Sequence, residues 1–160
     1  MIFTTADLAD AHEELQSCEF QFRSFGRSPR FWGAISTVRC RHDNALARRV
    51  LSQPGAGRVL VIDGDGSMKC ALVGDVMAGM AVANGWAGIV VHGAIRDSAA
   101  LAELDLGIKA LGTNPRRGTA AGEGDIDLPV EFGGAVFTPG DYLYADEDGI
   151  VVSARALQLG

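Results

Sequence analysis

The sequence predicts an α/β fold, a single domain over residues 1–160 with a central β-α-β unit and antiparallel C-terminal strands. Two continuous apolar runs of strand length, 58–63 and 87–92, flank a stretch of helical character at 76–84. This order predicts two parallel strands joined by a right-handed crossover. After Gly112 the chain changes to short apolar runs separated by glycines, which is typical of antiparallel strands joined by turns.

Residues 6–15 predict a short helix, and residues 31–40, where β-branched residues alternate weakly with others, predict a strand. Three phenylalanines, Phe20, Phe22 and Phe25, lie between them. We interpret them as a packing or subunit-contact segment, because clustered aromatic side chains usually bury surface rather than form a binding site.

Small polar residues and glycines mark the starts of two helices. Asp43 and Asn44 are suited to cap a helix that runs through Leu51, and Gly74 with Asp75 opens the central helix. Further elements are predicted as a helix at 98–104 and strands at 108–111, 128–132, 135–138 and 150–153, with a hairpin turn at Asp148-Gly149.

The composition, 48% hydrophobic and 21% charged residues, is ordinary for a globular protein. The three cysteines are widely spaced and form no C-x-x-C pair, which argues against a disulfide framework or a zinc site and favours a reducing cytoplasm. We see no signal peptide and no apolar run near the roughly 18 residues of a membrane span. The expected location is therefore cytoplasmic, with no membrane partner.

A formal net charge of −6 speaks against direct binding of nucleic acid, which depends on lysine and arginine neutralising phosphates. The local basic clusters are too small to form a tract. They are Arg39/Arg41, Arg48-Arg49 and Arg116-Arg117.

The start of the central helix is a candidate binding site for an anion. In open α/β sheets, ligands bind beyond the carboxyl ends of the parallel strands, where loops meet helix N-termini. The backbone N–H groups of Gly74, Asp75, Val76 and Met77 are expected to point outward there and to hold a carboxylate or phosphate. The alternative is that Asp75 merely caps the helix.

Arg96 and Asp97 follow the second buried strand and are the second candidate pair. An adjacent arginine and aspartate usually form a solvated surface pair. At a strand end, however, a guanidinium can bind a ligand carboxylate through two hydrogen bonds, and a carboxylate can face a hard cation. The two side chains point in different directions, so Asp97 is not necessarily paired with Arg96.

The chain has 21 glycines, about twice the average usage of roughly 7%. We expect Gly64, Gly66, Gly74 and Gly93 to let the backbone approach a small carboxylate ligand. The later glycines are expected to close short hairpins.

Several other kinds of site are disfavoured. The sequence satisfies neither G-x-G-x-x-G nor a Walker pattern, and its serines lack a nucleophile elbow. His92, at a strand end, is interpreted as a packed or supporting group rather than a metal ligand. The acidic run 146–149 lacks the remaining ligands of a calcium loop, so we expect a solvated turn.

Seven segments, in order over nearly the whole chain, resemble the RraA family, the regulators of ribonuclease activity A. That family overlaps the class II 4-hydroxy-4-methyl-2-oxoglutarate aldolases and has been labelled MenG-like. The segments are Phe25-Gly26, 43–46 (DNAL), 58–64 (RVLVIDG), 71–75 (ALVGD), 85–97 (GWAGIVVHGAIRD), 107–115 (GIKALGTNP) and 144–149 (YADEDG).

The resemblance implies a compact, sandwich-like domain related to the swivelling phosphohistidine domain, assembled as a homotrimer with sites between subunits. The aldolase pattern is an acid or glycine, twenty residues, Arg-Asp, two residues and another acid. Asp75, Arg96 and Asp97 match its core, whereas position 100 is Ala100 and the next carboxylate is Glu103.

The activity implied by the resemblance is retro-aldol cleavage of a 4-hydroxy-2-oxo acid to pyruvate, with oxaloacetate decarboxylation as a side activity. The metal, Mg²⁺ or Mn²⁺, would be held by Asp97 and mostly by water. Arg96 and the amides of residues 74–77 would bind the substrate carboxylate, and Asp75 could act as the base.

A second reading is open: a non-catalytic protein that binds and inhibits an endoribonuclease of the ribonuclease E type. Its support is Ala100 in place of the trailing acid and the regulator-like match of the flanking segments. An acidic protein could mask a basic RNA-binding region of such an enzyme. A third reading is an oligomeric scaffold with a vestigial pocket. A methyltransferase role is rejected, because no glycine-rich cofactor loop follows an initial strand.

Overall fold

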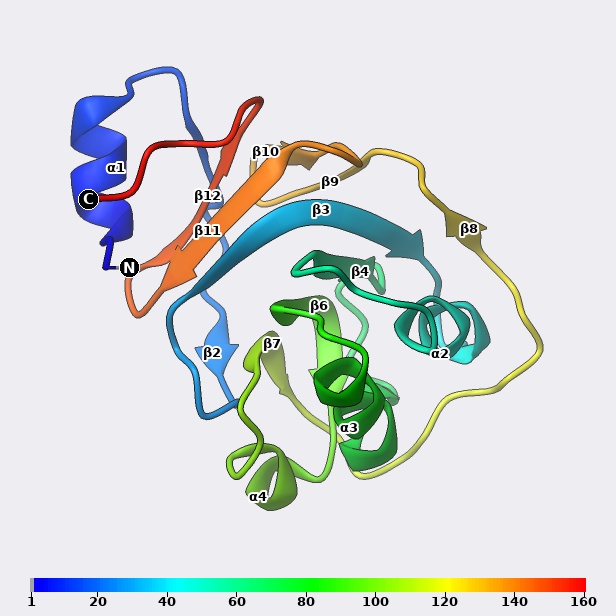
Figure 1. Ribbon diagram of the computed structural model, residues 1–160. Coiled ribbons are helices and arrows are strands. Elements are labelled where there is room, and N and C mark those ends of the chain that lie inside the picture. Colours follow the sequence, from blue (N-terminus) through cyan, green and yellow to red (C-terminus); the bar gives the residue numbers. More distant parts are fainter. Residues whose placement is uncertain (1) are drawn as a thin grey trace.

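The structure, a computed structural model, describes residues 2–160; Met1 lies outside the described residues. Four parallel strands form its centre (Figure 1): β3 (Phe31–Arg39), β4 (Val59–Asp63), β6 (Gly88–Ile95) and β7 (Gly107–Thr113). The predicted β-α-β unit is confirmed, because β4 and β6 pair in parallel with Val59 opposite Gly88. Helix α3 (Asp75–Ala83) lies between them in the chain.

The long strand β3 joins this parallel part of the sheet to an antiparallel part. Its first residues pair with β11 (Tyr142–Asp146), which pairs in turn with β12 (Gly149–Ser153). Its later residues pair with β4. The predicted antiparallel C-terminal strands are confirmed here and in the hairpin of β9 (Val130–Phe132) and β10 (Ala135–Phe137).

Three buried clusters surround the sheet. Helices α2 (Ala45–Leu51), α3 and α4 (Ser98–Leu101) cover one face of the parallel strands, and the largest cluster lies beneath them. The β9–β10 hairpin closes the second cluster on the opposite face. Helix α1 (Thr5–Ala11) packs against β11 and β12 over the third cluster. The fold is thus a mixed α/β arrangement, and the likeness to the phosphohistidine domain stays a prediction.

The predicted bounds differ from the observed ones at several ends. The first helix ends at Ala11 rather than residue 15, because the chain turns so that β1 (Gln16–Ser17) can pair with β12. Helix α4 ends at Leu101 rather than residue 104, because the next residues form turns in which the Leu104 amide donates to Leu101 O at 3.1 Å. Strand β6 continues to Ile95, beyond the predicted residue 92.

Four short strands escaped the sequence patterns, because two or three residues are too few for an apolar period to show. They are β1, β2 (Arg23–Ser24), β5 (Ala71–Val73) and β8 (Asp125–Ile126). Only β5 matters for the site, since it pairs with the end of β6. In the part of the chain that the structure describes, no helix is both long and apolar enough to cross a membrane.

The phenylalanine segment packs as predicted for its inner members. Phe25 is buried under the helices and Phe22 packs against the second cluster, whereas Phe20 stays 44% exposed. The His92 ring lies against Phe20 and Phe132, and its Nδ1 atom is 2.8 Å from Asp63 Oδ1. His92 is therefore a packed group, as the sequence predicts.

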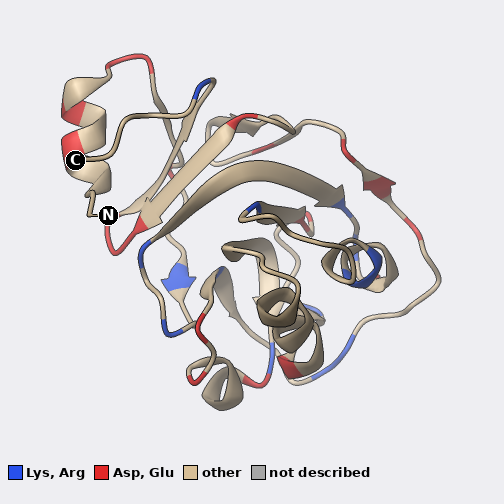
Figure 2. Ribbon diagram, viewed as in Figure 1, with Lys and Arg blue, Asp and Glu red and all other residues tan. Residues whose placement is uncertain are grey.

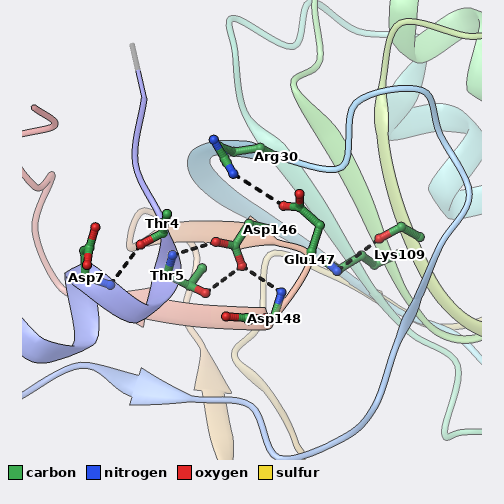
Figure 3. A network of polar contacts seen from close by, with 9 residues as sticks. Thr4, Thr5, Asp7, Arg30, Lys109, Asp146, Glu147 and Asp148 are labelled. Carbon is green, nitrogen blue, oxygen red and sulfur yellow. Dashed lines mark hydrogen bonds and ion pairs between the residues drawn. The ribbon is translucent and has the colours of Figure 1, made fainter.

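A buried carboxylate fastens the N-terminal helix to the sheet (Figure 3). Asp146, 3% exposed, accepts hydrogen bonds from the Thr5 amide at 2.7 Å, the Thr5 hydroxyl at 2.6 Å and the Asp148 amide at 3.0 Å. Burial alone raises the pKa of Asp146. These hydrogen bonds, with the nearby Arg30, outweigh burial and hold the pKa below its ordinary value.

A lowered pKa in the folded state means that Asp146 contributes stability above its unfolded pKa, and that this contribution is lost as pH falls through its folded pKa. We expect Asp146→Asn to lower the unfolding free energy at neutral pH by about 1–3 kcal/mol, because an amide nitrogen would meet the Thr5 donors. Urea unfolding followed against pH measures this effect. The exposed neighbour provides a control, and equal losses in Asp148→Asn and Asp146→Asn would contradict the assignment.

Candidate functional site

Strand β5 leads through Gly74 into helix α3, and Asp97 lies directly opposite. Gly74 is the extended N-cap residue of α3 and makes no side-chain cap. The Asp75 amide instead donates to Asp97 Oδ2 at 3.0 Å. A carboxylate at a helix N-terminus is favoured by the helix dipole and by the unpaired N–H groups of the first turn. The helix start therefore binds an anionic group as predicted, but one of its amides is taken by the protein's own Asp97.

The backbone around Asp97 is unusual. Asp97 adopts the left-handed conformation, with φ 60° and ψ 38°, which is uncommon for a residue other than glycine. The preceding residue is fixed, because the Arg96 amide donates to Val73 O of β5 at 3.0 Å. Non-glycine residues in this region cost energy and cluster at functional sites. This turn directs the Asp97 side chain toward α3 rather than along the sheet.

Gly74 is required by this close approach. A Cβ atom on Gly74 would lie 2.7 Å from Asp97 Oδ2 and 3.3 Å from Arg96 Nε. The expectation for Gly64, Gly66 and Gly93 is corrected, because none of them lines the small cavity beside Gly74. A Cβ on Gly64 would meet Leu72, and one on Gly66 would meet the His92 ring.

Arg96 is partly free to bind a ligand. Its Nε atom is 3.9 Å from Asp97 Oδ2, and Nη1 donates to Pro115 O at 3.5 Å, both long contacts. The two side chains are 38% and 37% exposed, so this ion pair is solvated and weak. Both charged groups therefore remain available to other partners.

Some residues at the N-terminus of α3 can contact a ligand through their side chains, and others only through their backbone. Asp75 is exposed at the mouth of the site. Val76 is 62% exposed, whereas the Met77 side chain is buried in the core. Met77 can therefore contribute only its amide.

A cavity of about 60 Å³ lies between these groups and opens beside a hollow of about 320 Å³. All six predicted residues of the site, Gly74 to Met77 and Arg96 with Asp97, line the smaller cavity. The structure adds Asn44, Arg48 and Arg117, which line both spaces. Figure 2 shows positive charge on α2 and on the segment after β7, while α1 is acidic.

These three residues come from elements that the sequence did not connect to the site. Arg48 lies on α2 and Arg117 on the loop after β7. Their clusters were visible in the sequence as small basic groups, but only the fold brings them to Arg96. Three guanidinium groups around one cavity favour an anionic ligand.

Asp43 fixes the loop that carries Arg117. The Asp43 carboxylate is fully buried and accepts from the amides of Ala45, Ala121 and Gly122 and from the Thr119 hydroxyl, at 2.7–3.2 Å. Burial raises the pKa of Asp43, but these four hydrogen bonds outweigh it and hold the pKa below its ordinary value. The charged side chain thus joins α2 to the wall of the larger hollow.

The side chains near Asp97 could bind a divalent cation that keeps most of its water ligands, but they could not surround one with protein ligands. Among residues 2–160, no group of three or more histidine, cysteine or acidic side chains could enclose a metal. Mg²⁺ usually keeps several waters and takes one or two carboxylates. The Asp97 carboxylate accepts the helix amide through Oδ2 and is partly exposed, so it fits such an ion. The methyl side chain of Ala100 adds no ligand.

The fold and site together define an α/β protein with an arginine-lined pocket at the carboxyl ends of its parallel strands. The model of the RraA-like family, described as Aldolase/RraA, matches residues 5–152. The chain therefore belongs to the RraA-like family.

Three solved structures show the same relationship. A Geobacillus kaustophilus protein, described as an S-adenosylmethionine:2-dimethylmenaquinone methyltransferase, is 44% identical, with a TM-score of 0.96 over 99% of this chain and 100% of that one. The RNA-processing inhibitor RraA from Thermus thermophilis is 42% identical, with a TM-score of 0.96 over 99% and 96%. Streptomyces coelicolor RraAS2, an unusual member of the RNase ES inhibitor RraA family, is 34% identical, with a TM-score of 0.70 over 86% and 71%.

The contact between Gly74 and Asp97 can be tested by substitution. We expect Gly74→Ala to fold normally but to displace Asp97 from the Asp75 amide, because the carboxylate is a movable side-chain end. Hydrogen exchange at the Asp75 amide should then become faster, as it should in Asp97→Ala. Gly79→Ala is the matched control, since a Cβ there meets nothing within 4 Å. It should add about 0.5–1 kcal/mol of stability. Unchanged exchange in Gly74→Ala would refute the contact.

Proposed function

We propose that this protein is a divalent-metal-dependent carbon–carbon lyase that cleaves 4-hydroxy-4-methyl-2-oxoglutarate and also decarboxylates oxaloacetate. The observation that carries the proposal is the meeting of Arg96, Asp97 and the α3 N-terminus at one arginine-lined cavity. Both reactions release a pyruvate enolate, so both need a site that holds a carboxylate and stabilises a negative oxygen.

In this proposal Arg96 and the amides at the start of α3 bind the carboxylate of the pyruvyl unit. The Asp75 amide is shared with Asp97, and those of Val76 and Met77 lie in the first turn, where N–H groups lack intrahelical partners. Arg96 supplies the opposing positive charge. Binding from two sides fixes the 2-oxo group beside Asp97.

Asp97 would hold Mg²⁺ or Mn²⁺, and the ion, when bound, supplies a Lewis acid for the developing enolate oxygen. Asp97 is suited to hold it because the α3 amide fixes one of its oxygens. Asp75, exposed beside Asp97, accepts the proton of the 4-hydroxyl, directly or through water. The bond between C3 and C4 then breaks, C4 becomes the carbonyl of one pyruvate, and C3 of the enolate takes up a proton to form the second.

We further propose that the active form is a cytoplasmic homotrimer, as the family resemblance implies. We do not propose a methyltransferase. The first parallel strand, β3, is followed by Cys40-Arg41-His42-Asp43, which offers no glycine-rich loop for a nucleotide cofactor.

Pyruvate release from each substrate, with Mg²⁺ and then with EDTA, tests the lyase. We expect metal-dependent turnover of both substrates and a loss of at least about 100-fold in Arg96→Ala and Asp97→Ala, comparable to the removal of one charge-stabilising group in other enzymes. Arg49→Ala is the control, because Arg49 is exposed on α2 and does not line the cavity. Turnover that survives EDTA, or that is unchanged in both site variants, would rule the proposal out.

A second candidate function is inhibition of a ribonuclease E-type enzyme. It is favoured by relatives described as an RNA-processing inhibitor and as a member of an RNase ES inhibitor family. Ala100 and the net charge of −6 agree with it. The two functions could occupy different surfaces of the same protein.

Inhibition of RNA cleavage by a purified ribonuclease E-type enzyme tests this candidate. We expect inhibition that weakens as salt increases, because charge attraction between the partners is screened. The Asp97→Ala protein should inhibit as well as the unmodified one, which would separate regulation from lyase chemistry. No inhibition at low salt would eliminate the candidate.

A further inference from the structure

Two arginines at the larger hollow are not paired with any carboxylate of the described chain. Arg48 and Arg117 are both exposed, and among residues 2–160 neither guanidinium group forms an ion pair. By contrast, Arg39 pairs with Asp125 at 2.9 Å on the same acidic protein. Like charges that line one hollow repel each other, and an anionic ligand relieves that repulsion.

The backbone holds Arg117 at the wall of this hollow. On one side the Ala71 amide donates to Arg116 O at 2.7 Å, and on the other the Asn44 amide donates to Thr119 O at 2.9 Å. These hydrogen bonds join the segment around Arg117 to the start of β5 and to the start of α2. A ligand group that Arg117 binds is therefore placed relative to both elements.

Arg48 lines the same hollow from α2. Its amide donates to Asn44 O at 3.0 Å, so the two residues lie one turn apart on one face of the helix, and both line the hollow. The next residue, Arg49, is also exposed but lines neither the hollow nor the small cavity. Val50 and Leu51 are buried in the core and fix the helix. Adjacent positions on α2 thus separate an arginine that can reach a ligand from one that cannot.

The hollow continues the cavity in which the pyruvyl unit is proposed to bind. Arg48, Arg96 and Arg117 line both spaces, so the two adjoin. In the proposed function, Arg96 and the α3 amides bind the first carboxylate of the substrate. The remaining part of 4-hydroxy-4-methyl-2-oxoglutarate is C4 with its hydroxyl, its methyl group and a second carboxylate. The hollow, about 320 Å³, has room for these groups.

We propose that Arg48 and Arg117 bind the distal carboxylate of the substrate, the one on C4, and thereby restrict the lyase to 2-oxo acids that carry a second acid group. This inference rests on the proposed lyase function. A guanidinium group can bind a carboxylate through two hydrogen bonds. The contact fixes C4, the carbon whose hydroxyl gives its proton to Asp75. An analogue with a methyl group in place of this carboxylate leaves both guanidinium groups unpaired and binds weakly.

The two proposed reactions treat the distal carboxylate differently. Retro-aldol cleavage keeps it, because it becomes the carboxylate of one of the two pyruvates. Decarboxylation of oxaloacetate releases the distal carboxylate as neutral carbon dioxide, so a guanidinium group that binds it stabilises the ground state more than the transition state. Arg48 and Arg117 therefore assist the first reaction and do not assist the bond-breaking step of the second.

Steady-state kinetics of Arg48→Ala, Arg117→Ala and the double variant test this role. The matched controls are Arg49→Ala and Arg116→Ala, because these neighbouring arginines are exposed and line neither space. We expect kcat/KM for the hydroxy-oxo acid to fall at least tenfold in each single variant, and kcat for oxaloacetate to stay within twofold or to rise. The controls should change neither value. No loss with the hydroxy-oxo acid, or an equal loss of kcat for oxaloacetate, would overturn the proposal.

A binding measurement separates this inference from the lyase proposal. 2-Oxoglutarate carries both carboxylates of the substrate but no hydroxyl, so retro-aldol cleavage cannot consume it. 2-Oxopentanoate differs from it only by a methyl group in place of the second carboxylate. With Mg²⁺ present, we expect calorimetry to show at least tenfold tighter binding of 2-oxoglutarate, and the double variant to lose that preference.

The two proposals can then fail independently. If neither the hydroxy-oxo acid nor oxaloacetate is turned over, the lyase proposal fails. A preference for 2-oxoglutarate that is lost in the double variant would still assign a dicarboxylate-binding site to Arg48 and Arg117. Equal binding of the two probes, no binding of 2-oxoglutarate, or a preference that survives in the double variant would overturn that assignment.

Discussion

One edge of strand β6 pairs first with β4 and then with β5, while the other edge pairs with β7, and the site depends on this change of partner. Over residues 88–92, β6 runs beside β4, and after a register shift against β7 between Val91 and Ala94 its end pairs with β5. This second pairing ties the Arg96 amide to Val73 O and sets Asp97 opposite Gly74. Without β5, the charged pair and the helix start would have no fixed relation.

Around this constraint, three carboxylates hold neighbouring segments in place; Asp43 and Asp146 are buried, and Asp97 is partly exposed. Asp97 accepts a hydrogen bond from the first amide of α3, Asp43 accepts one from the loop after β7, and Asp146 accepts one from α1. Each lies against backbone amides, which stabilise a charge without needing a cation. Arg96 makes only a long contact of 3.9 Å with Asp97, and among residues 2–160 no ion pair joins Arg48 or Arg117 to a carboxylate, so these arginines are available to a ligand. An acidic protein can in this way present a basic pocket.

Membership of the RraA-like family does not decide between catalysis and regulation, and the site shows why. Asp75, Arg96 and Asp97, which match the core of the aldolase pattern, line one cavity, whereas position 100 carries a methyl group. A site that binds a substrate carboxylate and a hydrated cation needs only these three residues. Inhibition of another protein requires none of these three residues. Two relatives of similar identity are themselves described by different functions, one as a methyltransferase and one as an RNA-processing inhibitor.

The sequence by itself determined the parallel β4–α3–β6 unit, the antiparallel C-terminal strands and the charged residues at the strand ends, because long apolar periods and capping glycines are local signals. It also indicated Gly74 to Met77, Arg96 and Asp97. Only the tertiary structure decided that Asp97 faces the α3 amides and that Asn44, Arg48 and Arg117 share the cavity. Strand β5 and these three residues depend on contacts between distant segments, and no local pattern records such contacts.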